Sequence, residues 1–171
     1  MVRFMIFNNK ICSMKKFFIA TLLLICAKFS IAQTAQSSTY NRAIGIKFPG
    51  GFSVTYKKFV TQSNNLEAQV TAWNKGFRMS GLYEFNFYSF NTVDGLAWFV
   101  GPGVHLGFWK EQYSKDYNSK ADFGVDGIIG LDYKFKDIPI NVSLDWEPSV
   151  TLVGSAGFTP SYGGFAVRYT F

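Results

Sequence analysis

From Asn41 to the end of the chain, hydrophobic and polar residues alternate one by one in repeated stretches. A period of two is typical of a β-strand whose two faces meet different surroundings. Short groups rich in Gly, Pro, Asn and Asp separate these stretches, as expected of turns. The pattern predicts eight strands, namely Asn41–Phe48, Phe52–Val60, Leu66–Trp73, Phe77–Phe87, Leu96–Trp109, Ala121–Tyr133, Ile140–Val150 and Ser161–Phe171.

The two faces of these predicted strands differ sharply in character. One face carries bulky apolar residues such as Ile44, Phe85 and Leu131, and Leu82, Phe99, Ile128 and Phe59 depart from the pattern. The other face carries glycines and most of the charges in the strands. Its charged residues are Lys47, Lys57, Glu67, Arg78, Glu84, Asp122, Asp126, Asp132, Asp145, Glu147 and Arg168.

Alternation alone leaves open which face points outward, because a soluble ligand-binding barrel of the lipocalin type keeps its apolar face inside. Side chains this bulky on eight strands would overfill so small an interior, whereas glycine and charge suit a narrow polar lumen. Large aromatic residues also gather near the strand ends, as in the girdles of membrane barrels. We therefore predict an all-β protein, an eight-stranded antiparallel up-and-down transmembrane β-barrel over residues 40–171.

The basic excess of the chain belongs to its beginning. The sequence has 17 Lys and Arg against 11 Asp and Glu, but residues 1–32 hold five basic residues and no acidic one. The remaining 12 basic residues nearly balance the 11 acidic ones. The charge therefore indicates no nucleic-acid partner.

The first 32 residues have the features of a secretory signal peptide. A positive segment begins at Met14, the likelier first residue, and the apolar run Phe17–Ala27 is too short to cross a bilayer. Small residues then precede a predicted cleavage after Ala32, followed by a flexible lead-in over residues 33–39. Both cysteines, Cys12 and Cys26, fall in the signal, so the mature chain offers no disulfide or thiolate metal site.

The closing strand points to a family. Its segment Phe165–Phe171 is amphipathic and ends on Phe171, with Tyr169 two residues earlier. Together with Gly127–Tyr133 and Pro139–Trp146, it resembles small outer-membrane β-barrel domains similar to the outer-membrane protein A and X barrels. The resemblance implies a monomer in the cell outer membrane, with membrane lipid as partner. It also implies that the barrel assembly machinery recognises Tyr169 and Phe171.

Several charged positions are predicted to meet inside the barrel. Hairpin geometry predicts that His105 faces Asp126 and that Asp126 faces Glu147. It also predicts a row of Lys57, Glu67 and Glu84, a pair of Asp145 with Arg168, and a contact of Trp73 with Arg78. The predicted polar network of the lumen comprises Lys57, Glu67, Glu84, His105, Asp126, Asp145, Glu147 and Arg168.

These residues favour structure over catalysis. Outer-membrane lipid A deacylases place a nucleophilic serine two residues after the histidine, where this chain has Gly107. We expect no catalytic residue, metal or cofactor, and a closed lumen with a role in envelope integrity or in surface contact. The exposed loops would be Lys110–Lys120 and Thr151–Pro160, with no ligand identified. A small-solute pore and a lipid A-modifying enzyme centred on His105 stay open as alternatives.

Overall fold

The computed structural model describes residues 40–49, 51–88, 93–110, 120–154 and 156–171. The predicted signal peptide, the lead-in and most of the loop Lys110–Lys120 lie outside these residues. The described part of the chain contains no helix long and apolar enough to cross a membrane.

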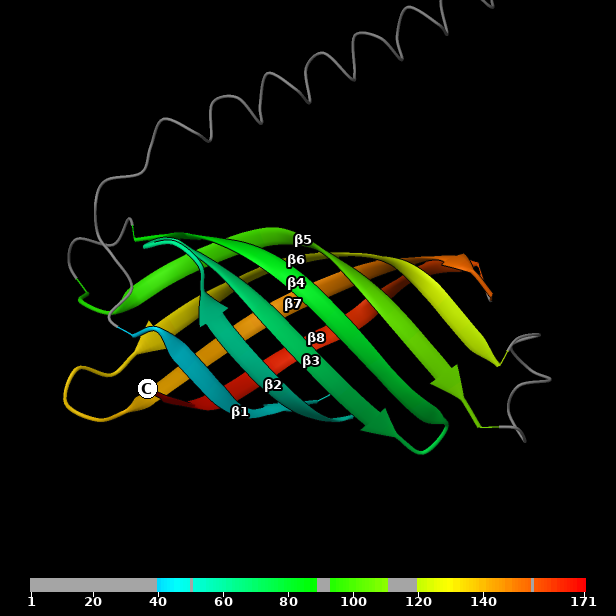
Figure 1. Ribbon diagram of the computed structural model, residues 1–171, viewed down its shortest axis with the longest axis horizontal. Helices are drawn as coiled ribbons and strands as arrows, with labels where there is room; N and C mark the ends of the chain where they lie inside the picture. Colours follow the sequence, from blue (N-terminus) through cyan, green and yellow to red (C-terminus); the bar gives the residue numbers. More distant parts are fainter. Residues whose placement is uncertain (1–39, 50, 89–92, 111–119, 155) are drawn as a thin grey trace, which may run out of the picture. The chain divides into compact units, whose positions relative to one another are not determined.

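Eight antiparallel strands form a closed barrel in which each strand pairs with its sequence neighbours and β1 closes against β8 (Figure 1). The predicted all-β, up-and-down barrel is therefore confirmed. Its strands are β1 (Arg42–Phe48), β2 (Phe52–Phe59), β3 (Asn64–Trp73), β4 (Gly76–Phe87), β5 (Leu96–Trp109), β6 (Ala121–Lys134), β7 (Ile140–Val153) and β8 (Gly157–Thr170).

The last hairpin is longer than its sequence pattern predicted. β7 and β8 remain paired as far as Thr151 and Gly157, so the long exposed loop predicted at Thr151–Pro160 is wrong. Small and hydroxyl-bearing residues hid the alternation here because they give little hydrophobic signal. The register also shifts between Glu147 and Ser149, beside a proline that has no amide hydrogen for the ladder.

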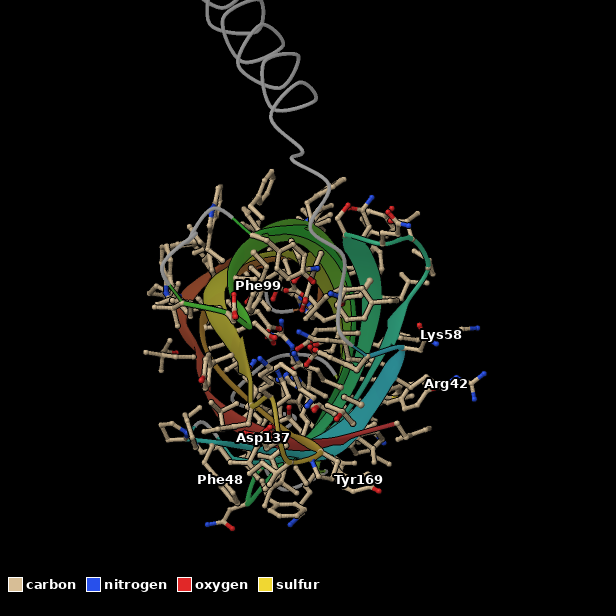
Figure 2. The ribbon with its side chains drawn as sticks, turned by 90° about the vertical axis from the view of Figure 1, so that its left-hand side faces the viewer. Arg42, Phe48, Lys58, Phe99, Asp137 and Tyr169 are labelled. Carbon is tan, nitrogen blue, oxygen red and sulfur yellow. The ribbon has the colours of Figure 1, made fainter. Side chains whose placement is uncertain are left out.

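The apolar face of the strands is the outer face of the barrel. Leu144, for example, keeps 60% of its surface exposed, and the outward positions of all eight strands carry exposed aliphatic or aromatic side chains. Figure 2 shows Tyr169 outside the ring of strands and Phe99 within it. The arrangement with the apolar face inside is therefore excluded.

Aromatic pairs lie near both ends of the outer surface. Phe77 and Phe108 stack with ring centroids 4.8 Å apart at the end that carries the β3–β4 turn. Phe87 and Trp98 stack at 4.2 Å toward the opposite end, where Phe171 also lies. The end with Phe171 is called the terminal end below, and the opposite end is called the mouth.

The residues that break the alternation fill the lumen rather than distort the strands. Leu82, Phe99 and Ile128 form a small buried apolar cluster inside the barrel. Phe59 packs edge-to-face against Tyr40 at a centroid distance of 5.1 Å, and β2 keeps a regular register through it. Its departure from the alternation therefore reflects an aromatic side chain in the lumen and not a bulge in β2.

Candidate functional site

A buried ionic network fills the interior of the barrel. Among the described residues, seven carboxylates and four Lys or Arg side chains are buried, together with His105. They form three groups, which we name by position along the lumen. The basal cluster, nearest the terminal end, is Lys57, Glu67, Glu84, Asp132 and Arg168; the middle cluster is Lys47, Asp145 and Glu147; and the mouth cluster is Arg78, His105, Asp122 and Asp126.

Lys57 is the centre of the basal cluster. Its Nζ lies 2.9 Å from Glu84 Oε2 and 3.3 Å from both Glu67 Oε2 and Asp132 Oδ1. The same ammonium lies 4.7 Å from the centroid of the Phe99 ring. A fully buried lysine is tolerated here because three carboxylates and an aromatic face replace its hydration.

Arg168 crosses the lumen to complete the basal cluster. Only 1% of its surface is exposed, and its Nη2 donates to Glu67 Oε1 at 2.7 Å. Its remaining groups donate to Ser143 Oγ at 2.6 Å and to Thr55 Oγ1 at 2.9 Å. The guanidinium therefore ties β8 to β2, β3 and β7, which a single hairpin contact could not do.

The middle cluster connects the two ends of the network. Lys47 Nζ lies 2.5 Å from Asp145 Oδ1 and 3.2 Å from Glu147 Oε2. Lys47 also donates to Gln69 Oε1 at 3.5 Å, and Gln69 donates to Glu67 Oε1 at 3.1 Å. Polar contacts thus run without a break from the middle of the lumen to the basal cluster.

The mouth cluster is organised around Asp126. Its Oδ1 accepts from Arg78 Nη2 at 2.5 Å and lies 2.8 Å from His105 Nδ1. Arg78 also lies 3.8 Å from Glu147 and stacks over the Tyr162 ring at 4.0 Å from its centroid. The carboxylate of Asp126, paired with arginine, carries no proton and can only accept hydrogen bonds. His105 Nδ1 is therefore the donor in its contact with Asp126.

Two glycines leave the space that His105 and Asp122 occupy. A Cβ at Gly124 would lie 2.4 Å from His105 Cε1, and one at Gly107 would lie 2.2 Å from Asp122 Oδ1. The Trp109 indole donates to the other carboxylate oxygen of Asp122 at 2.8 Å. A serine at position 107 would collide with this carboxylate. The Asp122 side chain, from the neighbouring strand β6, thus occupies the space where a lipid A deacylase would have its serine side chain.

The predicted partners of His105 were partly right. His105 is opposite Gly124 in the ladder, and Asp126 is opposite Ser149 instead of Glu147, so both predicted registers are wrong. The predicted contact between His105 and Asp126 nevertheless forms, because the side chains lean along the strands. Each predicted hairpin centre was one residue away from the observed one, which moves every partner by two positions.

The predicted row of Lys57, Glu67 and Glu84 exists as an ion cluster. The prediction that Lys57 is opposite Glu67 is confirmed, whereas Glu67 is opposite Leu82 and Glu84 is opposite Asn65. The second step of the row is therefore wrong in register. Lys57 reaches Glu84 directly, so it joins the two carboxylates that the ladder separates.

Two other predicted pairs do not form. Asp145 is opposite Gly164 and Arg168 is opposite Asn141, because the last hairpin turns nearer the start of the chain than predicted. The two charges bind partners on other strands, as described above.

The contact predicted between Trp73 and Arg78 is also wrong. Trp73 is opposite Gly76 and packs edge-to-face on Trp109 with centroids 5.6 Å apart. Arg78 turns inward to Tyr162. Five members were missing from the predicted network, although their place on the polar face of the strands could have indicated them: Lys47, Arg78, Asp122, Asp132 and Tyr162.

Two phenols lie just outside the strands at the terminal end. Burial raises the pKa of the Tyr40 hydroxyl well above its usual value, and the Asp132 carboxylate raises it further. Burial also raises the pKa of Tyr88, again helped by Asp132. Both phenols therefore stay neutral at the edge of the basal cluster.

Open space is unevenly distributed along the lumen. A cavity of about 20 Å³ lies between Lys47, Arg78 and Glu147. A larger cavity of about 180 Å³ opens at the mouth, beside His105 and Asp122. No group of three or more His, Cys, Asp or Glu side chains in the described part of the chain is arranged to hold a metal ion.

No protein-family model matches the chain, and no curated protein matches it in sequence. The barrel and its buried salt-bridge network therefore rest on the chain's own residues and geometry.

Proposed function

We propose that the mature protein is an integral outer-membrane β-barrel that works without catalysis. The observation that carries this proposal is the inversion of the usual burial pattern. Large apolar side chains cover the outside of the barrel, and charged side chains fill the inside. In water such an outer surface would far exceed the apolar patches that soluble monomers tolerate, whereas a bilayer is its natural solvent.

Three further features support a membrane location. The barrel is closed, so no strand edge leaves backbone groups without partners. Aromatic pairs lie near each end of its outer surface, as in the interfacial girdles of membrane barrels. The resemblance of residues 40–171 to outer-membrane protein A and X barrels agrees with both features and, with the signal peptide predicted at residues 1–32, favours export to the outer membrane.

The filled lumen favours a structural or surface role over transport. Buried charged or titratable side chains from all eight strands meet in the interior, and Arg168 spans it to reach Glu67. A solute path would have to break this network, so the small-solute pore is the weaker alternative. A role in envelope integrity, or in contacts through the turns at the mouth, needs no such path.

A lipid A-modifying enzyme is also disfavoured. His105 and Asp126 have the arrangement of an oriented base, yet the nucleophile position holds Gly107 and the Asp122 carboxylate occupies the space beside it. A serine nucleophile needs a hydrogen-bonded base to become reactive. We therefore assign this pair to the polar filling of the lumen.

Lipid and the assembly machinery are the proposed partners. Tyr169 and Phe171 point outward at the terminal end, where a machine that recognises the final strand could contact them. Truncating Phe171 should slow assembly more than it weakens the finished barrel, since one interfacial aromatic is a small part of the belt.

Cell fractionation tests the proposal directly. The protein should be recovered with outer membranes, resist extraction by urea, and run at a different gel position when left unheated. Recovery as a soluble periplasmic protein would overturn the membrane assignment. Planar-bilayer conductance separates the closed barrel from a pore, and a deletion strain assayed for permeability and lipid A mass separates an envelope role from an enzyme.

A further inference from the structure

The cavity at the mouth is built from side chains that the proposed function does not use. It has a volume of about 180 Å³ and lies at the end of the lumen away from Phe171. Three aromatic residues, Trp73, Trp109 and Tyr162, contribute to its wall, and Arg78, His105 and Asp122 supply its charged or titratable groups.

Two acceptor atoms of largely buried side chains face each other across a gap at this cavity. Asp122 Oδ1 and His105 Nε2 are 3.9 Å apart, too far for a hydrogen bond. His105 is 2% exposed and Asp122 is 8% exposed, so water outside the barrel does not solvate them freely. Within the described chain, neither atom has a hydrogen-bond partner.

The chemistry of the gap calls for a donor. The His105 Nδ1 proton is used on Asp126, so a neutral imidazole presents the lone pair of Nε2 to the Asp122 carboxylate. Two facing acceptors repel one another unless a group that can donate two hydrogen bonds lies between them. A ligand ammonium meets this need, because it donates to both atoms at once.

The surrounding charge also favours a cation. The mouth and middle clusters together contain four carboxylates, Asp122, Asp126, Asp145 and Glu147, against the permanent charges of Lys47 and Arg78. Arg78 is already committed to Asp126 and to the Tyr162 ring. Asp145 and Glu147 share Lys47, so one of the two uncompensated negative charges falls on Asp122, beside the cavity.

We propose that the mouth cavity binds a small organic cation, whose ammonium bridges Asp122 Oδ1 and His105 Nε2 while its apolar part lies against Trp73 and Trp109. Aromatic walls suit both halves of such a ligand, since their faces attract cations and their surfaces exclude water. This site does not depend on the membrane assignment, because the cavity belongs to the barrel itself.

Binding can be read from the cavity's own tryptophans. In a Trp98→Phe, Trp146→Phe background, the remaining indoles are Trp73 and Trp109, both at the cavity. The folded protein in detergent is titrated with 2-phenylethylamine and, as a neutral match of similar shape, with 2-phenylethanol. The alcohol controls for partition into the micelle. We expect the amine to bind at least about tenfold more tightly, as one charge-assisted hydrogen bond would provide.

Variants locate the effect. Asp122→Asn should abolish the preference for the amine, because its amide can still accept from Trp109 while its NH₂ fills the gap toward His105. Glu84→Gln removes a lumen carboxylate of the basal cluster and should leave amine binding within about twofold. Trp73→Leu alters the wall and none of the ionic partners, and should weaken binding of the amine.

Gel mobility of unheated samples verifies that each variant is folded. Equal affinity for amine and alcohol, or no binding of either, would overturn the proposal. Unchanged amine binding in folded Asp122→Asn would overturn it as well. If Asp122→Asn fails to fold, the Trp73→Leu variant provides the test. An unchanged affinity of Trp73→Leu for the amine would overturn the proposal.

Discussion

The two ends of the lumen contain the same kinds of charged side chain, but these side chains are closely packed at the terminal end and loosely packed at the mouth. In the basal cluster, Lys57 and Arg168 lie among three carboxylates, and the ion pairs there are 2.7–3.3 Å long. At the mouth, Arg78 makes one short pair with Asp126, while His105 and Asp122 stand 3.9 Å apart beside a cavity.

This difference suggests that the basal cluster stabilises the barrel, whereas the mouth cluster serves for binding. The basal cluster joins β2, β3, β4, β6 and β8 through direct contacts, so it holds together strands that are not neighbours in the sheet. The mouth instead borders a cavity lined by polar and aromatic side chains. Changes at the basal end should therefore cost stability, and changes at the mouth should alter binding more than folding.

The largest effect is expected from Lys57→Ala. This change leaves Glu67, Glu84 and Asp132 buried without their shared ammonium, and should lower the free energy of unfolding by about 3–5 kcal/mol. Urea unfolding of the refolded protein in lipid vesicles measures it. The matched control is Lys58→Ala, because Lys58 points outward and should change stability by less than about 0.5 kcal/mol. Equal losses in the two variants would mean that the basal cluster does not stabilise the barrel.

A smaller loss is expected from Arg78→Ala at the mouth. Asp126 loses its closest cation, but the cavity allows water and His105 to compensate, so we expect a loss of about 1–3 kcal/mol. The same unfolding assay applies. A loss as large as that of Lys57→Ala would remove the distinction between the two ends.

A double-mutant cycle sharpens the assignment of partners. Arg168→Ala and Glu67→Ala should be non-additive, with a coupling of about 1–2 kcal/mol, because their side chains bind at 2.7 Å. The pair suggested by the sequence, Arg168 with Asp145, should show much weaker coupling. The reverse result would restore the register predicted for the last hairpin.

The sequence predicted faces well and partners poorly, for a physical reason. Side chains alternate strictly in a strand, so an error of one residue in a turn centre moves every partner by two positions and leaves each side chain on its predicted face. Lys57 was placed opposite Glu67 correctly because its turn was centred correctly. Arg168 was misplaced because the last hairpin turns about two residues nearer the start of the chain than predicted, so that it lies opposite Asn141 instead of Asp145.

Contacts across the lumen could not be derived from hairpins at all. Arg168 meets Glu67 from β8 to β3, and Lys57 meets Asp132 from β2 to β6. Such contacts appear only when the sheet closes and the interior is narrow enough for long side chains to cross it. The room that His105 and Asp122 occupy likewise depends on two glycines in different strands, which no local pattern identifies as a pair.

The smallest effect is expected from Tyr40→Phe, at the edge of the basal cluster. Its hydroxyl donates to Asp132 over 3.5 Å, so its loss should cost less than about 1 kcal/mol at neutral pH. At alkaline pH the free energy of unfolding of the variant should rise relative to that of the parent. Burial raises the pKa of Tyr40 in the folded state, so its stabilising effect is complete below the unfolded value of about 10 and declines as pH rises through the folded pKa. Unfolding curves at neutral and alkaline pH measure this difference, and parallel pH dependence in the two proteins would show that Tyr40 is not shielded by the cluster.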